Sequence, residues 1–183
     1  MQRSVVMTII GEDRPGLVES VAAIVTDQGG NWLESRMSHL GGQFAGILRV
    51  EIPAERQQAL VAALRGLESR GLRVVVHPER DTTAPSAAPT SLLEIVGQDR
   101  PGIVKQISHA LAAHRVNVEE LHTECASAPM SGETLFKARA KLSIPASCDV
   151  AALRGQLEQI AGDLIVEISL AELPLDREPS GRK

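Results

Sequence analysis

The chain has 183 residues, 43% of them apolar, and carries a formal net charge of −4. This length suits one ordinary domain or two small ones, and the apolar content is sufficient for a buried core. The acidic balance argues against general duplex binding, which needs an excess of Lys and Arg to displace counterions, and no apolar run approaches the ~18 residues of a membrane helix.

The N-terminal segment indicates a protein of the cytoplasm. Its apolar run, residues 5–10, is too short for a signal peptide, and acidic residues follow immediately. We therefore expect a soluble cytoplasmic protein with no membrane contact. Because the chain holds one tryptophan, two phenylalanines and no tyrosine, its core must be built from aliphatic side chains.

The first part of the chain predicts a strand, a loop and a helix. Residues 5–10 are dense in β-branched and aliphatic side chains, as is typical of a central strand. The loop Gly11-Glu12-Asp13-Arg14-Pro15-Gly16 follows. We expect a helix to begin near Pro15, because proline is tolerated at the first helical position, and to stop at Gly29-Gly30.

The next segment predicts two strands, a second helix and a closing strand. Asn31 opens the first of these two strands. The helix follows Ile52-Pro53 and is lined by leucines at helical spacing, and residues 72–76 form the last strand. The helix leucines are Leu60, Leu64 and Leu67.

The second half of the chain repeats this order. Gly11 to Val18 recurs as Gly97-Gln98-Asp99-Arg100-Pro101-Gly102-Ile103-Val104 at an offset of 86, and Asn31 recurs as Asn117. Later the offset becomes 92, because Ile52-Pro53-Ala54 recurs as Ile144-Pro145-Ala146. The second copy therefore carries six extra residues, between about His122 and Thr134. At the same offset of 92, the closing strands align as Leu72, Val74 and Val76 with Leu164, Val166 and Ile168.

The second copy also gives the clearest strand pattern. From Leu135 to Ile144, apolar residues alternate with polar ones, which predicts a half-buried strand with one wet face. Lys137, Arg139 and Lys141 lie on the polar side, where they form either a basic ligand stripe or, more commonly, a plain solvated face. A helix over Val150, Leu153, Leu157 and Ile160 and a strand over residues 164–170 complete the copy.

These elements predict an α+β fold of two ferredoxin-like βαββαβ domains in tandem, each an antiparallel four-stranded sheet with two helices on one face. We expect domain 1 at residues 1–78, a linker at 79–90, domain 2 at 91–173 and a flexible tail at 174–183. One face of each sheet stays open unless another domain or a second chain covers it, so a homo-oligomer is compatible with this fold but not required.

The repeated loop has the chemistry of a small-molecule site. Gly11 and Gly16 carry no Cβ and permit close backbone approach, and the free N–H groups of the helix start favour a carboxylate. Asp13 could pair with an ammonium group or cap the helix. Arg14 could hold a carboxylate or simply lie on the surface, and Asn31 offers both a donor and an acceptor.

The candidate ligand-binding residues are therefore the loops and the asparagines of both copies. They are Gly11, Asp13, Arg14, Pro15, Gly16 and Asn31, and Gly97, Asp99, Arg100, Pro101, Gly102 and Asn117. The two sites need not be equivalent, since Glu12 and Glu19 are replaced by Gln98 and Lys105.

A βαββαβ unit with Gly-x-Asp-Arg-Pro-Gly after its first strand and Asn opening its second resembles the ACT domain. Two such units without a catalytic domain resemble the glycine cleavage system transcriptional repressor family, from about residue 3 to 171. The segment Ala128-Pro129-Met130-Ser131-Gly132, followed by Leu135-Phe136, strengthens this resemblance. The resemblance implies an amino acid or other small metabolite bound at the loop after the first strand, where two ACT units meet. It also implies control of transcription through a partner activator, with glycine as the signal and without direct DNA reading.

Two functions fit these features. The first is an amino-acid-sensing regulatory protein that acts on transcription of one-carbon and glycine metabolism through a protein partner. The second is an allosteric subunit, supplied in trans, of an enzyme of amino-acid metabolism. The insertion Cys125–Gly132 could be a lid, a partner-contact loop or a longer hairpin connection.

We do not expect an enzyme. The chain could be a truncated relative of formyltetrahydrofolate deformylase, an enzyme that carries an ACT-like unit before its hydrolase domain, but here a second unit stands in place of the hydrolase. No Ser-His-Asp set, nucleophile elbow or phosphate loop occurs. We expect no cofactor and no metal, because Cys125 and Cys148 lack CxxC spacing and no HExxH motif is present.

Overall fold

The computed structural model describes residues 1–77, 90–127 and 132–172. The chain divides into two compact units, Met1–Thr83 and Ala84–Lys183. Residues 79–89 of the expected linker and the whole expected tail, 174–183, lie outside the described residues, and Thr90 already begins a strand.

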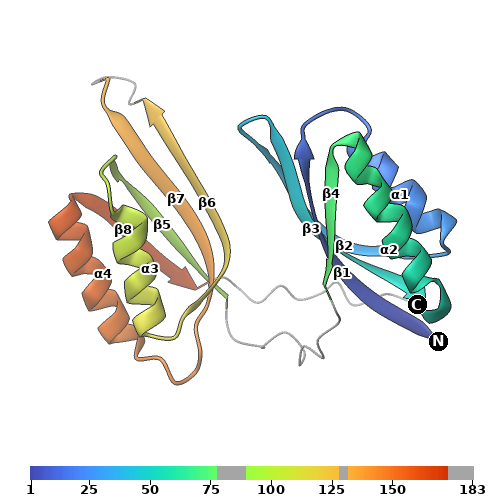
Figure 1. Ribbon diagram of the computed structural model, residues 1–183. Helices are drawn as coiled ribbons and strands as arrows, with labels where there is room; N and C mark the ends of the chain where they lie inside the picture. Colours follow the sequence, from blue (N-terminus) through green and yellow to red (C-terminus); the bar gives the residue numbers. More distant parts are fainter. Residues whose placement is uncertain (78–89, 128–131, 173–183) are drawn as a thin grey trace, which may run out of the picture. The chain divides into compact units, whose positions relative to one another are not determined.

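The first unit is a four-stranded antiparallel sheet with two helices on one face (Figure 1). Its strands lie in the order β2-β3-β1-β4. The elements are β1 (Gln2–Glu12), α1 (Leu17–Asp27), β2 (Asn31–Leu40), β3 (Gln43–Pro53), the 3₁₀ turn η1 (Ala54–Arg56), α2 (Gln57–Arg65), the 3₁₀ turn η2 (Gly66–Arg70) and β4 (Leu72–His77).

The second unit repeats the arrangement, with strand order β6-β7-β5-β8. The predicted α+β fold of two ferredoxin-like units is therefore confirmed. The elements are β5 (Thr90–Gln98), α3 (Ile103–Ala113), β6 (Asn117–Ser127), β7 (Thr134–Ser143), α4 (Val150–Leu164) and β8 (Val166–Glu172).

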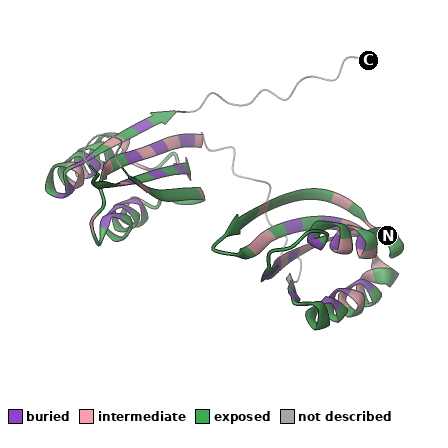
Figure 2. Cartoon of the chain, turned by 90° about the horizontal axis from the view of Figure 1, so that it is seen from above, coloured by how far each residue is buried: buried purple, intermediate pink, exposed green. Residues whose placement is uncertain are grey.

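Each unit has its own aliphatic core between its sheet and its helices. In β1, Val5, Met7 and Ile9 are at most 1% exposed, whereas the alternate residues are not buried. The same alternation is visible along several strands in Figure 2. As expected, Leu60, Leu64 and Leu67 are buried in the first core, and every second residue from Phe136 to Ile144 is buried in the second. This period of two leaves the opposite sheet face to polar side chains and to exposed apolar ones such as Ile10 and Ile47.

The first helix of each unit begins later than predicted. α1 starts at Leu17 and α3 at Ile103, so Pro15 and Pro101 precede the helices. The residues that adjoin the helices are Gly16 and Gly102, with φ of 89° and 100°. This left-handed backbone is readily adopted by glycine, and it turns the chain sharply from the loop into the helix.

The predicted alignment of the closing strands is wrong. Leu72 lies opposite Gly11 and Val166 lies opposite Gly97, so these two residues correspond at an offset of 94 rather than 92. Leu164 is the last residue of α4 and β8 starts at Val166. The apolar residues at 164, 166 and 168 have the spacing of two that is typical of a strand, although the first of them belongs to the helix. This spacing explains why the sequence placed the start of the strand too early.

Candidate ligand-binding loops

The predicted loop of each unit is hydrogen-bonded through its backbone to the neighbouring hairpin. The backbone N–H of Asp13 donates to the carbonyl of Gly42 at 2.9 Å. At the matching position, the N–H of Asp99 donates to the carbonyl of Thr134, also at 2.9 Å. The alternative in which Asp13 caps the following helix is excluded, because α1 has no side-chain cap. The Asp13 side chain is therefore available to other partners.

One such partner is a histidine that the sequence did not single out. Asp13 Oδ2 lies 3.7 Å from His39 Nε2 at the end of β2, and both side chains are about half exposed. The hairpin brings His39 to the loop, and the position 86 residues later is Cys125. Only knowledge of how the hairpin folds back could have predicted this contact.

The arginines of the two loops make different contacts. The Arg14 guanidinium donates to the backbone carbonyl of Arg70, in the turn before β4. Arg100 instead donates to the side-chain oxygen of Gln98 at 3.0 Å, on its own strand. The two loops are therefore similar in sequence but differ in how their arginines are held.

The first glycine of each loop lies inside a strand, where its missing side chain makes room for the adjacent strand. A Cβ built on Gly11 would lie 2.5 Å from the carbonyl oxygen of Gly71. A Cβ on Gly97 would lie 2.5 Å from Cγ1 of Val166. Packing alone thus explains why glycine occupies these two positions.

A hollow of about 240 Å³ lies beside the first loop and brings several predicted residues together. Asp13, Arg14 and Gly16 all line it. Three further lining residues, none of them among the predicted ligand-binding residues, provide an apolar wall and a second carboxylate: Val18, Phe44 and Glu19. Val18 is 44% exposed, so this wall is open to solvent and to a ligand.

The asparagines lie at the other end of the sheet from the loops. Asn31 opens β2 and pairs with Glu51, whereas the loop end of β1 pairs with Gln43. Eight residues of β3 separate these positions, which is roughly 27 Å of strand. Asn117 likewise opens β6 and pairs with Ser143. Within one unit, the structure therefore does not bring the loop and the asparagine together.

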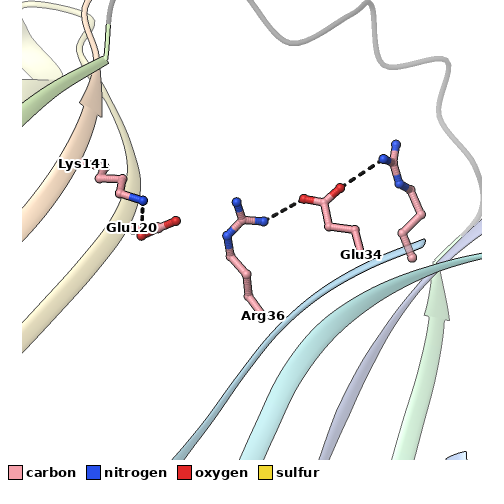
Figure 3. A network of polar contacts seen from close by, with 5 residues as sticks. Glu34, Arg36, Glu120 and Lys141 are labelled. Atoms are coloured by element: carbon pink, nitrogen blue, oxygen red, sulfur yellow. Dashed lines mark hydrogen bonds and ion pairs between the residues drawn. The ribbon is translucent and has the colours of Figure 1, made fainter. Parts of the chain in front are cut away.

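The open sheet faces are rich in ion pairs. In the first unit, Glu34 lies 2.7 Å from Arg36 and 3.0 Å from Arg49 (Figure 3). The hydrogen bond from Arg36, followed by the charge of Arg49, lowers the pKa of the Glu34 carboxyl. In the second unit, Lys141 pairs with Glu120 at 3.1 Å (Figure 3).

The basic side chains of β7 are exposed, and each has an acidic partner. Lys137, Arg139 and Lys141 pair with Glu124, Glu94 and Glu120 respectively. These ion pairs favour the solvated face over the basic ligand stripe that the sequence also allowed.

Within the described ranges, no group of three or more His, Cys, Asp or Glu side chains is placed to hold a metal ion. No helix among the described residues is both long and apolar enough to cross a membrane. Cys125 is exposed, Cys148 is half-buried, and both are free thiols.

The fold and the paired loops define a tandem ferredoxin-like protein with a candidate small-molecule loop in each unit. The chain belongs to the ACT-domain family, whose family model matches residues 3–77 and 90–170. The resemblance seen in the sequence is thereby confirmed.

Whole-chain relatives share both units. The glycine cleavage system transcriptional repressor of Escherichia coli (strain K12) is 24% identical over 171 residues, which cover 92% of this chain and 90% of that protein. The crystal structure of an unknown protein from Galdieria sulphuraria is 29% identical, with a TM-score of 0.81 over 95% of this chain and 100% of that one. A proposed glycine cleavage system transcriptional repressor of known crystal structure has 18% identity and a TM-score of 0.69, over 94% of this chain and 98% of that one.

Proposed function

We propose that this chain is an amino-acid-sensing regulatory protein that controls glycine and one-carbon metabolism through a protein partner, without catalysing a reaction. The observation that carries this proposal is the whole-chain likeness to the E. coli glycine cleavage repressor, which extends over both units. The net charge of −4 favours a protein partner, such as a transcriptional activator, over direct contact with nucleic acid. The family and the lack of a recognised catalytic motif support regulation, and we expect the protein to work in the cytoplasm.

The hollow beside the first loop is the proposed ligand site. A carboxylate would be held by Arg14 and by the free N–H groups at the start of α1. An ammonium group would be held by Asp13, with Glu19 next to it. The matching loop of the second unit offers Asp99 and Arg100, whereas Lys105 replaces Glu19, so we expect the second loop to hold an ammonium group less well.

Thermal unfolding of the full chain against glycine, other amino acids and one-carbon metabolites tests ligand binding. A ligand that binds only the folded state at 100 times its Kd adds about 2.7 kcal/mol of stability. In a unit of this size, that amount raises the Tm by about 10 °C or more. We expect one amino acid to produce this shift.

Variants then locate the ligand. Asp13→Asn and Arg14→Gln should remove the shift, and the matched Asp99→Asn and Arg100→Gln report on the second loop. Asn31→Ala and Asn117→Ala test the asparagines separately, because they lie far from the loop of their own unit. A folded protein that no compound stabilises would contradict the sensor proposal.

The partner is tested by affinity capture with the wild-type chain and the Arg14→Gln variant, with and without the stabilising amino acid. A transcriptional activator, captured in a ligand-dependent way, is the expected result. Capture of an enzyme of amino-acid metabolism instead would favour the allosteric-subunit alternative.

A further inference from the structure

The open sheet face of the second unit carries a hollow of about 720 Å³. Outward side chains form two rows across its four strands, and both rows line the hollow. One row is Glu124, Lys137, Val96 and Glu167. The other is His122, Arg139, Glu94 and Ser169. We refer to the space over these two rows as the charged groove.

The charged side chains of the groove are not all closely paired with one another. Arg139 is firmly paired, because its Nε and Nη2 both donate to Glu94 Oε1, at 3.0 and 2.7 Å. Lys137 is held loosely, with 3.7 Å between its Nζ and Glu124. Glu167 is exposed and, among the described residues, has no hydrogen bond or ion pair. The groove therefore presents a carboxylate without a partner and an ammonium that can take a closer one.

An apolar floor separates these two groups. Val96 lies between Lys137 and Glu167 in the same row and is 40% exposed. Adjacent strands are about 4.8 Å apart, so the backbones of Lys137 and Glu167 are separated by roughly 10 Å. From Lys137 to Glu167, the row thus presents a cation, an apolar surface and an anion in that order.

This pattern is a property of the second unit and not of the fold. Matching the strand registers, Lys137 corresponds to Ala45, Val96 to Ile10 and Glu167 to Arg73. The first unit therefore has no cation opposite an anion at these positions, although the two units share their cores and loops. Since both units form the same sheet with different residues at these positions, the fold does not require the charges of the second unit.

We infer that the charged groove binds a short zwitterionic peptide of two or three residues. Its terminal carboxylate pairs with Lys137, its terminal ammonium pairs with Glu167, and its middle lies over Val96. An extended chain spans about 3.3–3.6 Å per residue, so two or three residues match the separation of the two backbones, whereas a single amino acid spans about a third of it. This site is separate from the loop of the same unit, which precedes α3.

Triglycine is the probe, and binding to the full chain is measured by isothermal titration calorimetry and by backbone amide shifts. We expect triglycine to bind, glycine to bind this groove at least tenfold more weakly, and N-acetyl-triglycine amide, which lacks both terminal charges, to lose binding. Glu167→Gln and Lys137→Gln should each weaken triglycine binding by roughly tenfold, the effect of losing one charge-assisted contact. The matched control Arg73→Gln should leave it unchanged.

The amide shifts keep the inference testable even if a variant folds poorly. In the wild-type chain they should cluster on β5, β7 and β8. No binding of triglycine, binding by both groove variants as tight as by the wild type, or shifts confined to the loops would each overturn the inference. The result is distinguishable from the loop proposal, because Asp13→Asn and Asp99→Asn should abolish amino-acid stabilisation but leave triglycine binding intact.

Discussion

At the residue scale, the glycines of the two loops have unequal roles. Gly16 needs its positive φ of 89°, whereas Gly11 is buried in β1 with the carbonyl of Gly71 in the place of a side chain. The sequence motif gives no indication that the two glycines differ. Their different roles become apparent only from the structure.

We therefore expect Gly11→Ala to destabilise the first unit by about 1–3 kcal/mol, because a new methyl group must displace backbone in a packed sheet. Gly66→Ala is the matched control: no atom lies within 4 Å of a Cβ built there and its φ is −59°. Alanine at that position should be neutral or stabilise by about 0.4–1 kcal/mol. Urea denaturation curves measure both, and an unaffected Gly11→Ala variant would contradict the packing argument.

The Glu34 carboxyl is the second feature at this scale. Because Arg36 and Arg49 lower its pKa in the folded state, its contribution to stability is present at neutral pH. That contribution is lost as the pH falls through the lowered pKa. It is small, since the side chain is 47% exposed.

An NMR titration of Glu34 should show its pKa rising towards the ordinary glutamate range in Arg36→Gln, and rising less in Arg49→Gln. High salt should produce a similar rise, because exposed charges are screened. A midpoint that neither variant nor salt changes would show that these arginines do not control the carboxyl.

At the scale of elements, helix ends were harder to predict than helix faces. Leucine spacing placed α2 and α4 correctly, because burial follows the helical period. The loop motif placed a helix start at Pro15, but the positive φ of Gly16 delays α1 to Leu17. The arrangement of loop, His39 and Phe44 depends on contacts between segments distant in sequence, which no local pattern encodes.

Among the four α-helices of the described residues, only α4 has a side-chain cap. Asp149 accepts a hydrogen bond from the N–H of Ala152 at 3.0 Å. Asp149→Ala should therefore destabilise the second unit by about 1 kcal/mol, and lower its Tm by about 4–8 °C. Asp13→Ala, before the uncapped α1, should lack this effect in the absence of ligand. Equal losses of Tm in both variants would argue against a capping role for Asp149.

At the scale of the whole molecule, the two cores are separate clusters of side chains. Leu64 is fully buried in the first and Leu157 is 2% exposed in the second. Each Leu→Ala substitution should cost about 2–5 kcal/mol in its own unit.

Hydrogen exchange resolved along the chain measures this prediction. Leu64→Ala should lower amide protection in the first unit only, and Leu157→Ala in the second unit only. A loss of protection throughout the chain in either variant would mean that the two units unfold as one cooperative body.

The scarcity of aromatic residues has a spectroscopic consequence. Trp32 is the only tryptophan, there is no tyrosine, and Trp32 packs against the core of the first unit. Intrinsic tryptophan fluorescence therefore reports on the first unit, and the second unit has no tryptophan or tyrosine that would contribute to it. Emission from Trp32 should follow unfolding of the first unit alone, whereas far-UV circular dichroism follows both. The difference between the two signals isolates the second unit without any added dye.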